Sequence, residues 1–151
     1  MGRLRQELQG KKAYFDENIF IYAVEVVAPW AAESNTIFSG LKSNEFSAVT
    51  SNLTLSECLV KPFKEKRLDL ASIYRQVFLP RTYLNIAPID DKILILAARL
   101  RAETGLKLPD AIHTATAQIQ GCNAILTNDI GFKRVPGLEV FILSEWLATP
   151  L

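Results

Sequence analysis

The sequence predicts an α/β protein whose mostly parallel sheet, of about five strands, is covered by helices on both faces. Short apolar runs alternate with longer segments whose apolar residues recur at helical spacing, which is typical of parallel strands joined by crossover helices. The 151 residues, 49% hydrophobic and 22% charged, fit one domain with its own core. Since no repeat or linker divides the chain, we expect one domain over residues 13–151, preceded by an extension over residues 1–12 that is helical or disordered.

The first part of the chain is expected to form a strand, two helices and a second strand. Residues 12–16 are an apolar run that ends in an acid, which predicts the first strand. A helical apolar face follows over about residues 18–27, and Pro29 is expected to end it. Apolar residues at helical spacing predict a second helix over residues 30–43, and residues 46–50 resemble a strand.

The middle of the chain predicts two helices and a third strand. A turn leads into a helix over residues 53–60, which Pro62 is expected to stop because proline lacks a backbone N–H. Residues 69–79 predict the next helix, and residues 83–89 predict a strand.

The last part of the chain contains the clearest helix, over residues 90–104, and Gly105 is expected to close it in a left-handed conformation. Proline at the start of the next segment favours a new helix over residues 109–120. Residues 124–127 and 138–143 predict the last two strands.

Four acids follow these strands or begin the helices beside them. In open α/β sheets the ligand site lies beyond the carboxyl ends of the strands, so we expect the four side chains at one edge of the sheet. Asp16 ends the first strand, Glu57 lies on the helix after the second strand, Asp110 lies in the first turn of a late helix, and Asp129 follows the fourth strand.

Clustered carboxylates of this kind indicate a metal site. Unpaired acids repel one another and are costly to bury, whereas Mg²⁺ and Mn²⁺ take oxygen ligands. Such ions can orient a water molecule, help to deprotonate it and stabilise the leaving oxygen of a phosphodiester. This chemistry needs no histidine base, which agrees with a sequence that holds one histidine. For that residue, His113, we favour packing or hydrogen bonding over metal ligation.

Each acid also has a purely structural explanation. Asp16 is equally well explained as an ordinary strand end, and Asp129 as part of a turn. Glu57 completes a capping box that begins at Thr54, and in isolation this explanation is slightly favoured. Asp110 suits a first turn because the helix dipole stabilises negative charge there. No single acid is therefore sufficient evidence for a metal site. The support comes from the expected position of all four at the same edge of the sheet.

Four segments of the sequence resemble, in order, the motifs of PIN-domain nucleases, and more closely those of VapC-like toxins from bacterial and archaeal toxin–antitoxin pairs. The resemblance runs over about residues 13–146, and its most specific segment is residues 105–117. The segments are residues 15–22 (FDENIFIY), 50–57 (TSNLTLSE), 105–117 (GLKLPDAIHTATA) and 125–132 (ILTNDIGF).

The resemblance implies a three-layer α/β/α fold and a ribonuclease that depends on Mg²⁺ or Mn²⁺. It implies that the four acids are the catalytic residues and metal ligands, and that Asn18 and Thr127 support the first and last acids by hydrogen bonding. It further implies a homodimer that is blocked by an antitoxin whose tail covers the site. One departure is Glu17, where the family usually has Thr or Ser, and this carboxylate either disturbs the metal site or faces away.

Binding of RNA requires positive charge near the acids. The net charge of +1 does not by itself indicate a nucleic-acid-binding protein, but setting the four acids aside leaves 12 acidic against 17 basic residues, a remainder of +5. Some relatives carry a further acid where this chain has Lys133 and Arg134, which leaves the number of metal ions open. The candidate substrate-binding residues are Lys61, Lys64, Lys133 and Arg134, with Lys66, Arg67 and Lys107 nearby in sequence.

Three other functions compete with an active nuclease. A catalytically inactive PIN-like module that binds RNA or serves as a scaffold usually lacks at least one acid, and none is missing here. A receiver-type phosphoacceptor domain would need an Asp at the end of a middle strand, where this chain has Thr50 and Ser51. A Rossmann nucleotide-binding domain would need a Gly-rich loop after a strand, and the sequence contains none.

The sequence favours a cytoplasmic protein without export or membrane segments. The apolar run after the basic start is short and interrupted by acids, and no run approaches the length of a membrane span. Cys58 and Cys122 lie in helix-like apolar patterns, so we expect reduced core thiols, with a disulfide between them as the alternative.

Overall fold

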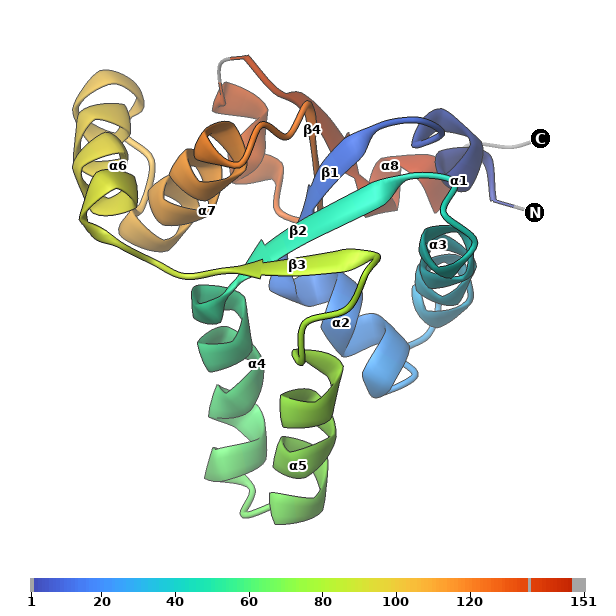
Figure 1. Cartoon of the computed structure of the whole chain (residues 1–151). Helices are drawn as coiled ribbons and strands as arrows, with labels where there is room; N and C mark the ends of the chain where they lie inside the picture. Colours follow the sequence, from blue (N-terminus) through green and yellow to red (C-terminus); the bar gives the residue numbers. More distant parts are fainter. Residues whose placement is uncertain (1, 136, 148–151) are drawn as a thin grey trace.

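The computed structural model describes residues 2–135 and 137–147, without the side chains of residues 133, 134 and 147, and it confirms the α/β fold (Figure 1). Within these residues, one five-stranded sheet has the order β3-β2-β1-β4-β5, and every neighbouring pair of strands is parallel. The strands are β1 (Lys12–Phe15), β2 (Ser47–Ser51), β3 (Leu84–Ala87), β4 (Ala124–Thr127) and β5 (Glu139–Ile142).

Helices cover both faces of the sheet, as expected for parallel strands (Figure 1). One face is covered by α6 and α7, and the other by α1, α2, α3 and α8, while α4 and α5 pack against each other as a hairpin that extends from the body. The helices are α1 (Arg3–Glu7), α2 (Glu17–Val24), α3 (Ala31–Lys42), α4 (Asn52–Lys64), α5 (Leu68–Val77), α6 (Asp91–Thr104), α7 (Leu108–Ile119), the 3₁₀ helix η1 (Ile130–Arg134) and α8 (Leu143–Leu147).

Strand β1 lies in the middle of the sheet and is buried on both faces. Phe15 packs into the core cluster on the α1–α3 side, whereas Tyr14 packs on the α6–α7 side, because successive side chains of a strand point to opposite faces. Tyr14 pairs in register with Val49 of β2 and Ile125 of β4. This register brings the carboxyl ends of three strands to one edge, where the predicted acids follow.

The N-terminal segment is tied to the same core. Residues 3–7 form α1, and the side chains of Leu4 and Leu8 are fully buried in the cluster that contains Phe15. Arg5 forms an ion pair and hydrogen bonds with Glu45.

Two predicted helix boundaries were wrong. Pro62 does not stop α4, because Phe63 and Lys64 continue the helix for two residues beyond it and burial of the proline offsets its missing N–H bond. Helix α2 ends at Val24, well before Pro29, because Val26 adopts a left-handed conformation with φ of 53°. Strand β3 is also shorter than the seven residues expected over 83–89.

Other predictions about the chain were confirmed. Gly105 closes α6 with φ of 74°, and β4 has the predicted bounds. Cys58 and Cys122 are buried free thiols. In the described part of the chain, no helix has both the length and the apolar character needed to cross a membrane.

Candidate metal-binding active site

Asp16 lies at the centre of the carboxyl edge and is 2% exposed. It follows β1 directly and caps the N-terminus of α2, where its Oδ1 accepts a hydrogen bond of 2.7 Å from the backbone N–H of Glu17. Its Oδ2 accepts a hydrogen bond of 2.7 Å from Thr127 Oγ1, and the same hydroxyl accepts one of 3.0 Å from the backbone N–H of Asp129. Thr127 therefore connects the first acid to the last, and the Asp16 carboxylate has a fixed orientation.

Glu57 reaches the same edge from α4. Its Oε1 lies 2.7 Å from Nε2 of His113 on α7, and that nitrogen lies 3.8 Å from Asp16 Oδ1. The capping-box explanation of Glu57 is wrong, because α4 begins at Asn52 and Glu57 therefore lies in its second turn, too far along to bond back to the helix start. Its side chain is 26% exposed, so it is open to solvent on one side.

Glu17 faces into the site, which answers the question that the sequence left open. Ligand atoms of Asp16, Glu17, Glu57 and His113 all lie within 4.8 Å of one another. Burial, together with the neighbouring Asp16 and Glu57 carboxylates, raises the pKa of Glu17 far above its usual range. A proton or a cation is therefore needed among these carboxylates.

Asp110 and Asp129 lie beside each other at the same edge, outside this cluster of four. A Cβ atom on Gly131 would lie 3.1 Å from Asp129 Oδ1 and 3.8 Å from Asp110 Oδ2, so the Gly131 backbone runs close to both carboxylates. Asp129 Oδ1 accepts a hydrogen bond of 2.8 Å from the Gly131 N–H. Burial, and then the charges of Asp129 and Asp16, raise the pKa of Asp110 to about 6.

The predicted quartet thus gathers at one edge, with two acids in the tight cluster and two beside it. Asn18 is half-buried in the first turn of α2, and its support of Asp16 stays a prediction. Lys61 and Lys64 are exposed on α4, and Lys61 Nζ lies 3.4 Å from Glu25 Oε1. The side chains of Lys133 and Arg134 lie outside the described residues.

The groups that surround His113 were not predicted from the sequence. Tyr14 OH lies 2.6 Å from His113 Nδ1 and 2.8 Å from Ser51 Oγ, and all three residues are buried. Hydrogen bonding, which was the favoured role of His113, is observed. The one available signal for Tyr14 was its position in β1, since strand alternation directs it to the face that α7 covers.

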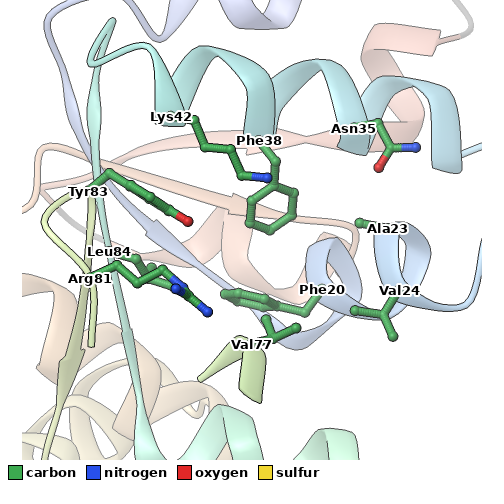
Figure 2. Close-up of a pocket in the computed structure, with 10 residues that line it drawn as sticks. All are labelled: Phe20, Ala23, Val24, Asn35, Phe38, Lys42, Val77, Arg81, Tyr83 and Leu84. Atoms are coloured by element: carbon green, nitrogen blue, oxygen red, sulfur yellow. The ribbon is translucent and has the colours of Figure 1, made fainter. Parts of the chain in front are cut away.

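A second feature is a pocket of about 410 Å³ between α2, α3, the end of α5 and the start of β3. Phe20, Phe38 and Leu84 form much of its apolar lining. Figure 2 shows the cationic ends of Lys42 and Arg81 beside the two aromatic rings. The pocket therefore combines an apolar floor with positive charge.

Comparison with known proteins gives the same fold and a family. Among solved structures, VapBC2 from Rickettsia felis bound to a promoter DNA fragment has a TM-score of 0.69 at 21% identity, covering 87% of this chain and 98% of that one. A toxin–antitoxin complex from Klebsiella pneumoniae has a TM-score of 0.64 at 28% identity, covering 87% and 97%. VapC20 from Mycobacterium tuberculosis, a toxin that cleaves the sarcin–ricin loop, has a TM-score of 0.69 at 15% identity, covering 85% and 98%.

No curated protein matches the sequence. The family model of the PIN domain matches residues 13–138, most of the chain and every residue of the site described above. This chain belongs to the PIN-domain family.

Proposed function

We propose that this protein is an endoribonuclease that depends on Mg²⁺ or Mn²⁺, and that it is the toxin of a toxin–antitoxin pair. The observation that carries the proposal is the convergence of Asp16, Glu57, Asp110 and Asp129 on one edge of the sheet. The raised pKa of Asp110 reflects both its burial and the charges of its three partners, so these carboxylates lie close enough to repel one another. Such an arrangement is stable with all acids ionised only when a cation joins them.

The donor set fits a hard divalent cation. Carboxylate oxygens are the ligands that Mg²⁺ and Mn²⁺ prefer, and the partly exposed Glu57 leaves room for water and a substrate phosphate. The four acids would hold the metal, which when bound lowers the pKa of a water molecule and stabilises a leaving oxygen. Thr127 and the Glu17 N–H hold Asp16 in one orientation for this task.

RNA as the substrate is supported by the relatives and by surface charge. VapC20, which is 15% identical to this chain, cleaves the sarcin–ricin loop. RNA is therefore the first substrate to test. Lys61 and Lys64 lie on α4, the helix that also carries Glu57, and Lys107 lies at the start of α7 near Asp110. These exposed cations are suited to contact backbone phosphates.

An antitoxin partner is supported by the complexes among the similar structures. The pocket with Phe20, Phe38, Lys42 and Arg81 suits an amphipathic segment that carries acidic side chains. Phe38→Glu is expected to weaken binding of the purified antitoxin in calorimetry, and unchanged affinity would place the antitoxin elsewhere.

The function is tested first by Mn²⁺ titration in a calorimeter and then by cleavage of labelled RNA. Asp110→Asn is expected to lose both Mn²⁺ binding and cleavage. Asp91→Asn is the matched control. Asp91 is an exposed acid in the first turn of α6, where, as for Asp110 in α7, the helix dipole stabilises a negative charge. If the wild-type protein binds no Mn²⁺ at millimolar concentration, the metal-dependent nuclease is excluded and the inactive scaffold becomes the better explanation, with Glu17 as the first suspect.

A further inference from the structure

A continuous chain of polar groups runs from the interior of the sheet to the candidate metal site. Ser51 Oγ lies 2.8 Å from Tyr14 OH, which lies 2.6 Å from His113 Nδ1, and His113 Nε2 lies 2.7 Å from Glu57 Oε1. Ser51 and Tyr14 are fully buried and His113 is 1% exposed. The four residues come from β2, β1, α7 and α4, so this chain joins four separate elements.

The imidazole of His113 has both nitrogens occupied and no freedom to turn. Its ring is enclosed by Tyr14, with a centroid distance of 5.4 Å, and by Phe132, at 6.4 Å. A carboxylate can only accept a hydrogen bond, so the Nε2 that faces Glu57 carries a proton. Because each ring nitrogen faces an oxygen partner, Tyr14 OH at Nδ1 and Glu57 Oε1 at Nε2, the direction of the Nε2–H bond is set by the buried core.

Glu57 needs such a partner more than Asp16 or Asp129 does. Asp16 is oriented by two hydrogen bonds at the end of its strand, and Asp129 by the backbone of Gly131. Glu57 has a longer side chain on a helix surface and is partly exposed, so several rotamers are open to it. The hydrogen bond from His113 selects the one that directs the carboxylate toward Asp16.

We propose that His113 is a positioning residue that holds the Glu57 carboxylate in the orientation the metal requires, with Tyr14 and Ser51 holding the imidazole in turn. This inference rests on the proposed function, because it takes Glu57 as part of the metal site. Direct ligation by His113 would require Nε2 to give up both its proton and its bond to Glu57. Removing a residue that hydrogen-bonds to a metal ligand in this way typically lowers metal affinity or activity by about 10- to 100-fold.

The experiment compares Mn²⁺ affinity in four variants by calorimetry. His113→Leu is expected to weaken binding by about 10- to 100-fold. His113→Gln, whose amide can still donate to Glu57, is expected to recover part of this loss, and Tyr14→Phe to cause a smaller one. Thr116→Val is the control, since Thr116 is buried on the same helix and its hydroxyl donates a hydrogen bond to the Ile112 carbonyl of that helix. If His113→Leu binds Mn²⁺ as tightly as Thr116→Val does, the inference is wrong.

Two further measurements separate this inference from the proposed function. His113 is the only histidine in the sequence, so its ¹⁵N signals are unambiguous, and the metal-free protein is expected to show an exchange-protected Nε2 proton that is lost in Glu57→Ala. An unprotonated or freely exchanging Nε2 overturns the positioning role whether or not metal binds.

The second measurement is the electron paramagnetic resonance of bound Mn²⁺. Strong coupling to an imidazole nitrogen would make His113 a ligand and would overturn the positioning role as well. A protected Nε2 proton together with no Mn²⁺ binding would overturn both the metal site and the positioning of Glu57 for it.

Discussion

At the scale of single residues, Asp110 makes the stability of the folded protein depend on pH. Burial and the nearby charges of Asp129 and Asp16 raise its pKa from 3.8 to about 6. The folded protein therefore binds this proton more tightly than the unfolded chain does. The resulting stabilisation is complete below pH 4 and is lost as the pH rises through about 6.

We therefore expect Asp110→Asn to raise the melting temperature of the metal-free protein at pH 7 and to have little effect at pH 4. The neutral amide removes a repulsion that exists only when the carboxyl is ionised. Differential scanning calorimetry in a chelator, at both pH values, measures the effect. A melting temperature at pH 7 that is equal to or below that of the wild-type protein would contradict the proposed repulsion.

Glu17 is the residue that distinguishes this site from the usual family pattern. Burial, and then a hydrogen bond to Asp16, raise the pKa of Glu17, so in the metal-free site protonated Glu17 engages the carboxylate that a cation has to reach. Glu17→Thr is therefore expected to bind Mn²⁺ several-fold more tightly at pH 6 and to flatten the rise in affinity between pH 6 and pH 8.

The control for Glu17 is Glu33→Thr, because burial also raises the pKa of Glu33 but this residue lies on α3, which contributes no residue to the site. Calorimetry at the two pH values separates the possibilities. Weaker binding by Glu17→Thr at both pH values would make Glu17 a metal ligand instead of a competitor.

At the scale of elements, the junction between α6 and α7 fixes the helix that carries Asp110 and His113. Gly105 adopts φ of 74° there, a conformation that costs other residues about 1–2 kcal/mol. Apart from its two chain neighbours, no atom of the described residues lies within 4 Å of a Cβ at this position, so a side chain would meet strain in the backbone alone.

Gly105→Ala is accordingly expected to lower the melting temperature by about 2–8 °C, since 1 kcal/mol corresponds to about 2–4 °C in a domain of this size. Gly105→Asn should lose less, because Asn tolerates the left-handed region better. Thermal unfolding of both variants tests this, and equal melting temperatures for wild type and Gly105→Ala would show that the strain is relieved by movement of the junction.

At the scale of the whole molecule, the α4–α5 hairpin is the most prominent projection from the body (Figure 1). Val60 and Phe63 of α4 are 55% and 56% exposed, and Leu68 at the start of α5 is 73% exposed. Exposed apolar side chains gathered on one hairpin are typical of an interface. We propose this hairpin as the contact surface of the expected homodimer.

Light scattering should then give a mass of twice the 16.9 kDa chain for the wild-type protein. Phe63→Glu is expected to give the monomer, because a buried unpaired charge opposes association. Ile95→Glu serves as the control, since Ile95 is 63% exposed on α6. Dissociation by Ile95→Glu and not by Phe63→Glu would move the interface to α6.

The sequence by itself determined the order of the elements and the edge at which the acids lie. Hydrophobic periodicity is a local property of the sequence. It predicted the bounds of β4, and Gly105 was correctly expected to close α6. The rule that parallel strands present their carboxyl ends together was enough to predict one shared edge for Asp16, Glu57, Asp110 and Asp129. Local rules failed where packing outweighed a local signal. Proline was expected to stop α4, but Pro62 is buried near the end of the helix, which continues past it.

Only the tertiary structure decided which atoms meet. Residues 57 and 113 are 56 positions apart, and their hydrogen bond depends on the register of β1 and β2 and on how α7 packs over Tyr14. The inward direction of Glu17 was equally hidden, because a sequence position fixes the helix turn but not the rotamer. Side-chain orientation is selected by burial and by partners from distant elements, and that selection exists only once the core is packed.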